Sequence, residues 1–330
     1  MGVIRKKAVI VACASNENLY IRDWAEYHLK LGFKKIFIID NSPEPGGDYP
    51  EYVLGDYVAK KKVQIIRLRK HKTNPKGLQM AAYTVIYKAF YRQFDWMFFI
   101  DVDEFVTFLE NSGIKKIYDF LARPEIDGAD QIKMNWLIYT DNGLVHYDPR
   151  PVYKRFTEIM MPLDKHDWSF PVPVNMTLKS AINCKKSNIA DFVSTNSPHF
   201  ALTSKIDKAV CVTPSGQPTE WNKAVGTIDY DVMCLRHYRC MTIEEFLYRK
   251  ILNNGKGNAL GCIFDKDTYI KMFSVENVIT EEKKKIIDDF FDNLSKIQPT
   301  ILEQEDNSMN YNEMIIKIEN VIFGKEIWPL

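Results

Sequence analysis

The feature that most constrains the fold is an unbroken apolar run from Trp96 to Ile100, which stops at the acidic sequence Asp101-Val102-Asp103. A short continuous apolar run is typical of a strand buried on both faces, as in a parallel sheet covered by helices. Open α/β sheets bind ligands just beyond the carboxyl ends of their strands. The run therefore predicts a central strand, with Asp101 and Asp103 at the edge where a ligand would bind.

These two carboxylates favour a divalent cation. If the segment is extended, alternate side chains point the same way, so Asp101 and Asp103 are expected on one side. Two carboxylates aimed at one point repel each other unless a positive charge lies between them, and a divalent cation with oxygen ligands is the usual solution. The alternative is a pair of solvated acids at a strand end, because an Asp-x-Asp triplet is common.

The segments before this strand alternate between strand and helix patterns. Strands are expected at residues 8–12, 35–39 and 63–68, and helices follow Ser15 or Asn16 as N-cap and span residues 76–91. This order predicts an α/β fold with a doubly wound sheet, helices on both faces and right-handed crossovers. His28 lies on the apolar stripe of the first helix, which favours a packed rather than a catalytic histidine.

Later patterns are less regular. A short helix is expected at residues 114–122, and strands at 130–139, 174–182, 199–202, 210–213 and 232–238. Thr242 and Glu245 have the spacing of a capping box at the start of a helix, and a further amphipathic helix is expected over residues 280–297. The long irregular excursion between residues 140 and 230 is typical of a functional segment rather than a linker.

Composition excludes some functions. The formal net charge of +1 argues against a broad surface for nucleic acid. Lys60 to Lys76 nevertheless carries several basic residues and no acid, which predicts either a solvated face or contact with a polyanion or anionic lipid. The six cysteines include no Cys-x-x-Cys pair, so buried free thiols in a reducing compartment are expected. No stretch approaches the ~20 apolar residues of a membrane helix, which predicts a cytoplasmic protein.

Several segments, taken in order, resemble one enzyme family. They are YIRDWAEYHLKLGFKKIFIIDN, DWMFFIDVDEF, MNWLIYTDNG, VYKRF, LKSAIN, SPHF and LRHYRCMTIEEFLYRK. Together they resemble the GT-A glycosyltransferases, in particular the family-2-like bacterial group related to glycosyltransferase family 92. The resemblance implies a GT-A-like (Rossmann-like) mixed sheet in a domain of residues 1–255, with a nucleotide-sugar-binding half (1–110) and an acceptor-side half (111–255). The resemblance ends near residue 255, and residues 256–330 are expected from their own pattern to form a helical C-terminal extension.

The resemblance also implies site residues. In the family, the Asp-x-Asp carboxylates hold Mn²⁺ or Mg²⁺ against the diphosphate of the donor, and a late histidine completes the ligand set. The metal ligands implied here are Asp101, Asp103 and His237, with His199 as the competing histidine. The implied donor-binding residues are Ala14, Ser15, Glu17, Asp40, Gln79, Asp101, Val102 and Lys179. The family commonly has Lys-Asn-Glu where this chain has Ser15-Asn16-Glu17, so the phosphate contact of that lysine is lost.

The implied reaction is metal-dependent, inverting transfer of a hexose, from UDP-galactose or UDP-glucose, to a hydroxyl of a glycan or lipid-linked acceptor. The implied setting is bacterial surface polysaccharide synthesis (lipopolysaccharide or capsule), with peripheral contact at the cytoplasmic face of the inner membrane. Displacement by a hydroxyl needs a base within hydrogen-bond reach. Asp141 is the first candidate because it follows an acceptor-side segment, and Glu158, Asp164 and Asp167 are alternatives.

Two other classes remain open. A haloacid-dehalogenase-like phosphatase also places Asp-x-Asp after an apolar strand, but it normally uses the first strand and has Thr or Val where this chain has Phe105. A non-catalytic carbohydrate-binding protein on the same fold is the second alternative. Metal-dependent UDP binding and donor hydrolysis distinguish the three classes.

Overall fold

The computed structural model describes residues 5–42, 49–67, 75–159, 177–186, 209–220, 228–239, 242, 244–245, 281, 283–289 and 291–292, without the side chains of residues 75–78 and 81. The chain divides into two compact units. The first comprises Met1–Asn41, Tyr49–Ile138 and Met161–His237, and the second comprises Ser42–Asp48, Tyr139–Met160 and Tyr238–Leu330. Each unit is therefore described by itself.

The first unit alternates strands and helices in its first hundred residues, as the sequence predicts. In chain order its elements are β1 (Ala8–Ala14), α1 (Asn18–Leu31), β2 (Lys35–Asp40), α2 (Glu51–Ala59), β3 (Val63–Arg67), α3 (Pro75–Phe90), η1 (Tyr91–Gln93), β4 (Trp96–Phe99), β5 (Glu104–Phe108), η2 (Glu110–Ser112), α4 (Ile117–Leu121), α5 (Pro124–Asp127), β6 (Gln131–Ile138), β7 (Leu178–Asn183), β8 (Cys211–Val212) and β9 (Met233–His237).

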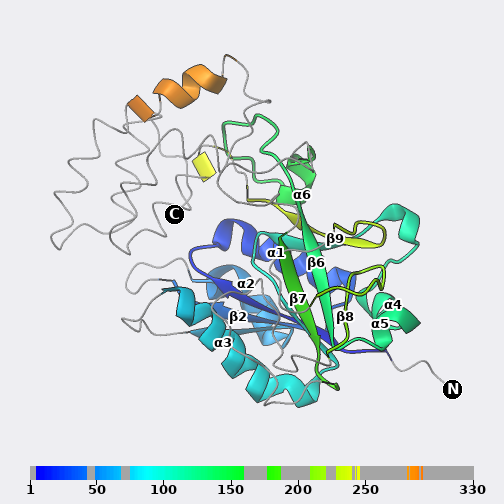
Figure 1. Ribbon diagram of the computed structural model, residues 1–330. Helices are drawn as coiled ribbons and strands as arrows, with labels where there is room; N and C mark the ends of the chain where they lie inside the picture. Colours follow the sequence, from blue (N-terminus) through cyan, green and yellow to red (C-terminus); the bar gives the residue numbers. More distant parts are fainter. Residues whose placement is uncertain are drawn as a thin grey trace. The chain divides into compact units, whose positions relative to one another are not determined.

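The described strands form one mixed sheet in the order β3-β2-β1-β4-β7-β6-β9-β5, with β8 paired to β6 (Figure 1). β1 pairs in parallel with β2 and β4, and β2 with β3. Beyond β4 the sheet changes character, because β7 is antiparallel to both β4 and β6. β9 is parallel to β6 and antiparallel to β5. The predicted mixed, doubly wound α/β sheet is confirmed.

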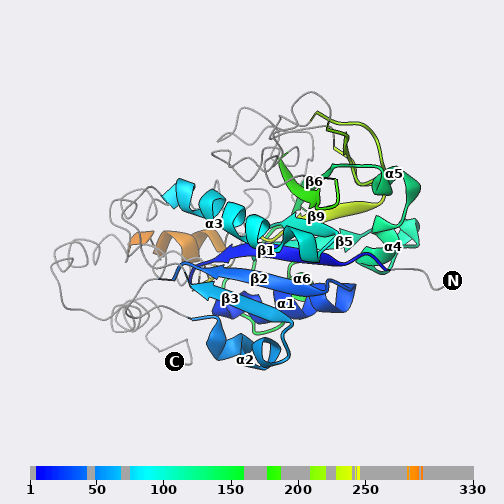
Figure 2. The same ribbon diagram turned by 90° about the horizontal axis from the view of Figure 1, so that it is seen from below.

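Helices cover both faces of the parallel part of this sheet. In Figure 2, α3 lies over one face of β1, β2 and β3, and α1 and α2 lie over the other. The α3 side is a continuous apolar cluster in which Val9 and Phe37 of the strands pack with Tyr83 and Ile86 of the helix. Full burial of one such aliphatic or aromatic side chain stabilises the fold by roughly 1.5–3 kcal/mol, so this packing supports the strand positions that define the edge.

The start of α1 differs from the expectation. Its N-cap is Glu17 rather than Ser15 or Asn16, and Asn16 has a φ of 54°. The reason is that β1 continues two residues further than predicted, to Ala14, which pairs with Asp40 and accepts a hydrogen bond from the Asn41 N–H at 2.8 Å. The turn between β1 and α1 therefore lies later in the chain than expected.

The second unit contains α6 (Val152–Arg155) and helical residues at 283–289. The predicted capping box is present: Glu245 N–H donates to Thr242 Oγ1 at 3.1 Å, and Thr242 N–H donates to Glu245 Oε2 at 3.1 Å. Glu245 also forms a buried ion pair with Arg155. These contacts join residues from two distant stretches of this unit. The domain boundary expected near residue 255 lies outside the described residues.

Two further sequence expectations concern the chain as a whole. Cys13, Cys184, Cys211 and Cys234, the cysteines that the structure describes, are free thiols. Among the described residues, no helix has the length and apolar character that crossing a membrane requires.

His28 is fully buried, as expected. Its Nδ1 lies 2.9 Å from Trp24 O, and its Nε2 accepts the Val106 N–H at 3.2 Å. This arrangement suits a neutral imidazole, and burial lowers the pKa of His28 to about 3. In the unfolded chain the imidazole of His28 binds a proton as the pH falls below about 6.5, whereas in the folded chain the buried imidazole stays neutral. His28 therefore contributes stability that is lost as the pH falls below about 6.5.

We expect the free energy of unfolding to fall by about 2 kcal/mol more in the wild type than in His28→Gln between pH 7 and pH 5, since only the wild type carries this linkage. Urea unfolding at both pH values measures the difference. His146→Gln, at an exposed histidine, is the control and should behave like the wild type. An equal pH dependence in all three proteins would contradict a neutral buried His28.

Candidate metal and nucleotide site

The acidic sequence after β4 forms a turn. The Glu104 N–H donates to Asp101 O at 3.1 Å, and the Asp101 N–H donates back to Glu104 Oε2 at 2.8 Å. The chain then continues as β5, which the sequence analysis did not predict. The argument that Asp101 and Asp103 alternate along an extended segment is therefore wrong, because the Glu104 carboxylate closes a turn between them.

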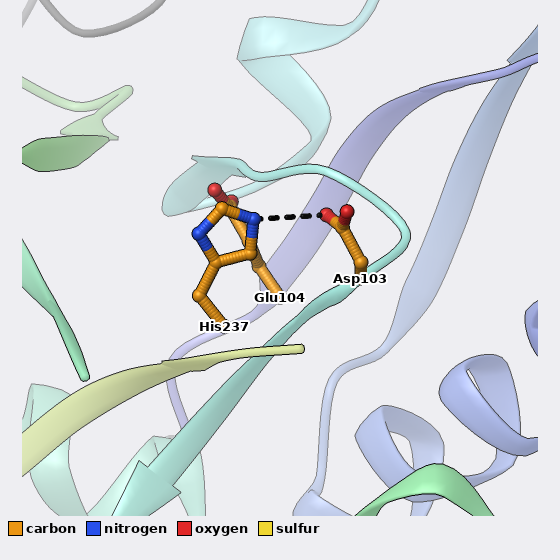
Figure 3. A group of neighbouring side chains, drawn as sticks. All are labelled: Asp103, Glu104 and His237. Atoms are coloured by element: carbon orange, nitrogen blue, oxygen red, sulfur yellow. Dashed lines mark ion pairs between the residues drawn. The ribbon is translucent and has the colours of Figure 1, made fainter. Parts of the chain in front are cut away.

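A cluster of three potential metal ligands lies at this turn: Asp103, Glu104 and His237 (Figure 3). Strand pairing places two of them together, because Glu104 of β5 is directly opposite His237 of β9. His237 Nε2 lies 3.5 Å from Asp103 Oδ1. One ligand atom from each residue lies within 4.8 Å of the others. Two carboxylates and one imidazole can bind a divalent transition-metal ion, whereas Mg²⁺ prefers oxygen ligands.

Glu104 is held by several groups at once. The Trp136 indole N–H donates to Glu104 Oε1 at 2.7 Å, and the same indole packs on the His237 ring with a centroid distance of 4.2 Å. The side chain of Glu104 is fully buried. Burial raises the pKa of Glu104 to about 8; the charge of Lys179 opposes this shift and the neighbouring aspartates add to it. Glu104 therefore organises the turn as well as offering an oxygen.

Asp101 faces a different set of partners. Gln79 Nε2 of α3 donates to Asp101 Oδ1 at 2.9 Å, and Lys179 Nζ of β7 donates to Asp101 Oδ2 at 2.5 Å. Lys179 also lies 3.5 Å from Glu104 Oε1. Burial lowers the pKa of Lys179, but the charges of Asp101 and Glu104 outweigh burial and hold the pKa above its ordinary value. The structure thus brings Gln79, Asp101 and Lys179 together, as a group beside the three-ligand cluster.

The donor-side residues at the ends of β1 and β2 lie at the same edge of the sheet. β1, β2 and β4 are parallel, and Ala14 is opposite Asp40, so Ala14, Asp40 and Asp101 all lie at carboxyl ends. Ser15 Oγ donates to Asn41 O at 3.3 Å. Glu17 and Val102 are buried at this edge as well. Whether these residues contact a donor stays a prediction.

Asp40 ends β2 and is fully buried. Arg67, at the end of β3, lies with its Nε 3.3 Å from Asp40 Oδ2 and its Nη2 2.9 Å from Glu51 Oε1. The Arg67 guanidinium also stacks over the Tyr49 ring at 4.1 Å from the centroid. A carboxylate beside a planar guanidinium and an aromatic ring can bind a planar polar group such as a nucleobase.

The candidate base lies in the second unit. Asp141 is buried, accepts the Gly143 N–H at 3.0 Å and forms an ion pair with Lys283. Burial raises the pKa of Asp141, and the Lys283 ammonium opposes that shift. Of the alternatives, Glu158 is exposed, whereas Asp164, Asp167 and the competing ligand His199 lie outside the described residues. The assignment of the base stays a prediction.

Sequence reasoning missed three residues of this site: Glu104, Trp136 and Arg67. Glu104 starts the run Glu104-Phe105-Val106-Thr107-Phe108, whose aromatic and β-branched residues indicate a strand. That signal could have assigned Glu104 to a separate strand after the Asp-x-Asp triplet. Trp136 and Arg67 lie in predicted strands, but no sequence signal identifies the partners that strand pairing gives them.

The sequence profile of glycosyltransferase family 92 matches residues 10–197. The chain belongs to glycosyltransferase family 92. The matched range includes Asp40, Asp101, Asp103 and Lys179, and it ends before His237. Membership confirms the resemblance drawn from the sequence and the class of enzyme that it implied, and it favours that class over the phosphatase alternative.

Solved structures with a similar arrangement include two glycosyltransferases. One is the mannosyltransferase PcManGT from Pyrobaculum calidifontis in complex with GDP-Man and Mn²⁺, with 10% identity, a TM-score of 0.28, and coverage of 40% of this chain and 36% of that chain. The other is GalNAc-T7 with UDP, GalNAc and Mn²⁺, with 13% identity, a TM-score of 0.32, and coverage of 55% and 35% respectively. The match thus spans about a third of each of those chains. A search of the curated proteins finds no significant match.

The ligand cluster makes a direct prediction about metal binding. Asp103→Asn and His237→Gln should each weaken Mn²⁺ binding at least about tenfold, because the first removes the charge of a carboxylate ligand and the second removes the imidazole nitrogen. Isothermal titration of Mn²⁺ into each variant measures the effect. Asp56→Asn is the control and should bind Mn²⁺ as the wild type does, because Asp56 lies on α2 in a surface ion pair with Arg22 of α1. Unchanged affinity in both site variants would place the metal elsewhere.

Proposed function

We propose that this protein is a metal-dependent glycosyltransferase that moves a hexose from a nucleotide sugar to a hydroxyl group of a glycan acceptor. The observation that carries the proposal is the cluster of Asp103, Glu104 and His237 at the carboxyl edge of β1, β2 and β4, in a chain of glycosyltransferase family 92. The edge of a parallel sheet is where α/β proteins bind nucleotides. The cluster adds the acidic and imidazole ligands that a diphosphate-bound cation requires.

Asp103 and His237 are the residues that would hold the metal directly. Glu104 offers a further oxygen, and Asp101 would act through water or by direct ligation, since Gln79 and Lys179 already orient its carboxylate. When bound, the cation supplies a positive charge that stabilises the departing diphosphate. The mixed nitrogen and oxygen set favours Mn²⁺ over Mg²⁺. Trp136 packs on His237 and keeps its ring in place.

The nucleoside end of the donor would bind at Asp40. Its carboxylate can accept hydrogen bonds from a base N–H or from ribose hydroxyls, while Arg67 presents N–H donors and Tyr49 presents a stacking face next to it. UDP is the nucleotide that we propose, and galactose or glucose the sugar, both on the resemblance to the family. Ser15 and Glu17 would line the same edge.

The acceptor hydroxyl would attack opposite the diphosphate with inversion at the sugar carbon. Asp141 is the base that we propose, and it would take the proton of that hydroxyl. Its ion pair with Lys283 keeps a positive charge beside the carboxylate, which favours the ionised form that a base needs. The resemblance further suggests a lipid-linked acceptor of bacterial surface polysaccharide synthesis, handled at the cytoplasmic membrane.

The proposal predicts that UDP binding requires the metal. We expect UDP to bind at least about tenfold more tightly with Mn²⁺ than with EDTA, since the cation screens the repulsion between the diphosphate and the carboxylates. Calorimetry measures this difference, and released nucleotide from a panel of UDP-sugars and GDP-sugars identifies the donor. Metal-dependent binding without donor turnover would indicate a non-catalytic binding protein. Binding without any metal dependence would contradict the proposal.

The role of Asp40 is tested separately. Asp40→Asn should weaken UDP binding about tenfold and leave Mn²⁺ binding without nucleotide unchanged, because Asp40 is paired with Arg67 rather than with the ligand cluster. Calorimetry with Mn²⁺ alone and with UDP in saturating Mn²⁺ measures both effects. Asp130→Asn, which alters another buried carboxylate, at the Val210 N–H, is the matched control. Equal losses of Mn²⁺ and UDP affinity in Asp40→Asn would indicate general unfolding of the edge instead.

A further inference from the structure

A fully buried lysine lies between two acids of the site. Lys179 Nζ is 2.5 Å from Asp101 Oδ2 and 3.5 Å from Glu104 Oε1, and the side chains of Lys179 and Glu104 are both fully buried. Moving an ammonium and a carboxylate out of water costs several kcal/mol per ion unless geometry and further hydrogen bonds compensate. The ammonium of Lys179 and the two carboxylates therefore compensate one another's cost of burial.

Both partners are also oriented by neutral donors. Asp101 accepts the Gln79 amide, and Glu104 accepts the Trp136 indole and the Asp101 N–H. These hydrogen bonds set direction, but they bring no net charge. Lys179 supplies the positive charge. Asp101 and Asp103 bring negative charges, to which Glu104 adds a third when it is ionised, so the acids of this group outnumber its one ammonium.

We propose that Lys179 is a positioning residue that sets the charge of the metal site, so that the site binds a divalent cation weakly by itself and firmly together with a nucleotide diphosphate. This inference rests on the proposed function. Like charges a few ångströms apart in a partly buried site repel strongly. Lys179 thus reduces the attraction of the acids for a cation, and the diphosphate restores that attraction when the donor arrives.

A different role for Lys179 gives a different result. If Lys179 contacted the donor phosphates, as the resemblance implies, its removal would weaken UDP binding and leave the binding of the cation alone unchanged. In this structure its ammonium is buried against Asp101, so a phosphate would have to displace that ion pair. The two roles are separated by measuring Mn²⁺ without nucleotide.

The test uses the full chain and Mn²⁺ alone, titrated by calorimetry or by the electron paramagnetic resonance signal of the free ion. We expect Lys179→Met to bind Mn²⁺ about tenfold more tightly than the wild type, or ~1.4 kcal/mol. UDP should raise the Mn²⁺ affinity of the wild type about tenfold and that of Lys179→Met less. Equal Mn²⁺ affinity in both proteins, or weaker UDP binding with unchanged Mn²⁺ affinity, would overturn the proposal.

Lys133→Met is the matched control. Lys133 is also fully buried and lies on β6, where it pairs with Ser180 next to Lys179, but its electrostatic neighbours are Cys211 and Glu220. Its removal should lower stability without tightening Mn²⁺ binding. Tighter Mn²⁺ binding in Lys133→Met as well would show a general effect of losing a buried lysine and would overturn the role of Lys179.

Two measurements keep the proposal testable if Lys179→Met does not fold. Lys179→Gln removes the same charge with a polar side chain and should show the same gain in Mn²⁺ affinity. The wild type alone should show the coupling between UDP and Mn²⁺. Independent binding of the two would contradict the proposed function together with the role of Lys179, whereas coupled binding with no gain in Mn²⁺ affinity in Lys179→Gln would overturn only the role of Lys179. A wild type that binds neither Mn²⁺ nor UDP would contradict the proposed function itself, which is a distinguishable result.

Discussion

The site depends on the carboxylate of Glu104. It accepts the Asp101 N–H and so closes the turn after β4, and it accepts the indole of Trp136 from β6. Pairing of β5 with β9 then places His237 opposite it. A buried carboxylate is costly unless donors surround it, so these contacts are also what keeps Glu104 in place. The turn, the neighbouring strand and His237 are therefore organised around one side chain.

The sheet supplies two different things to this site. Its parallel part, β3-β2-β1-β4, provides an edge at which Asp40 and Asp101 follow buried strands. Its other part, in which β7 pairs antiparallel with β4 and β9 pairs antiparallel with β5, brings Lys179 and His237 from late in the chain to that edge. The acidic turn lies between the two parts, so the residues that we propose for the nucleotide and those that we propose for the cation lie at one edge.

Charge explains why these residues occur together. Three acids around one point would repel each other, and the buried Lys179 compensates part of that charge within the protein. The remaining negative charge is suited to a divalent cation. Arg67 likewise compensates the charge of Asp40, at the end of β2. Its guanidinium also pairs with Glu51 and packs on the Tyr49 ring.

The sequence by itself determined the alternation of strands and helices, because the apolar run from Trp96 to Ile100 and the helical stripe around His28 are local patterns of burial. It also identified the acidic triplet and, through the family resemblance, Asp40 and His237 as candidates. Only the tertiary structure decided that Asp101 and Asp103 are separated by a turn and that Glu104 lies opposite His237. The physical reason is that strand register and buried ion pairs join residues that are far apart in the sequence, and no local pattern carries that information.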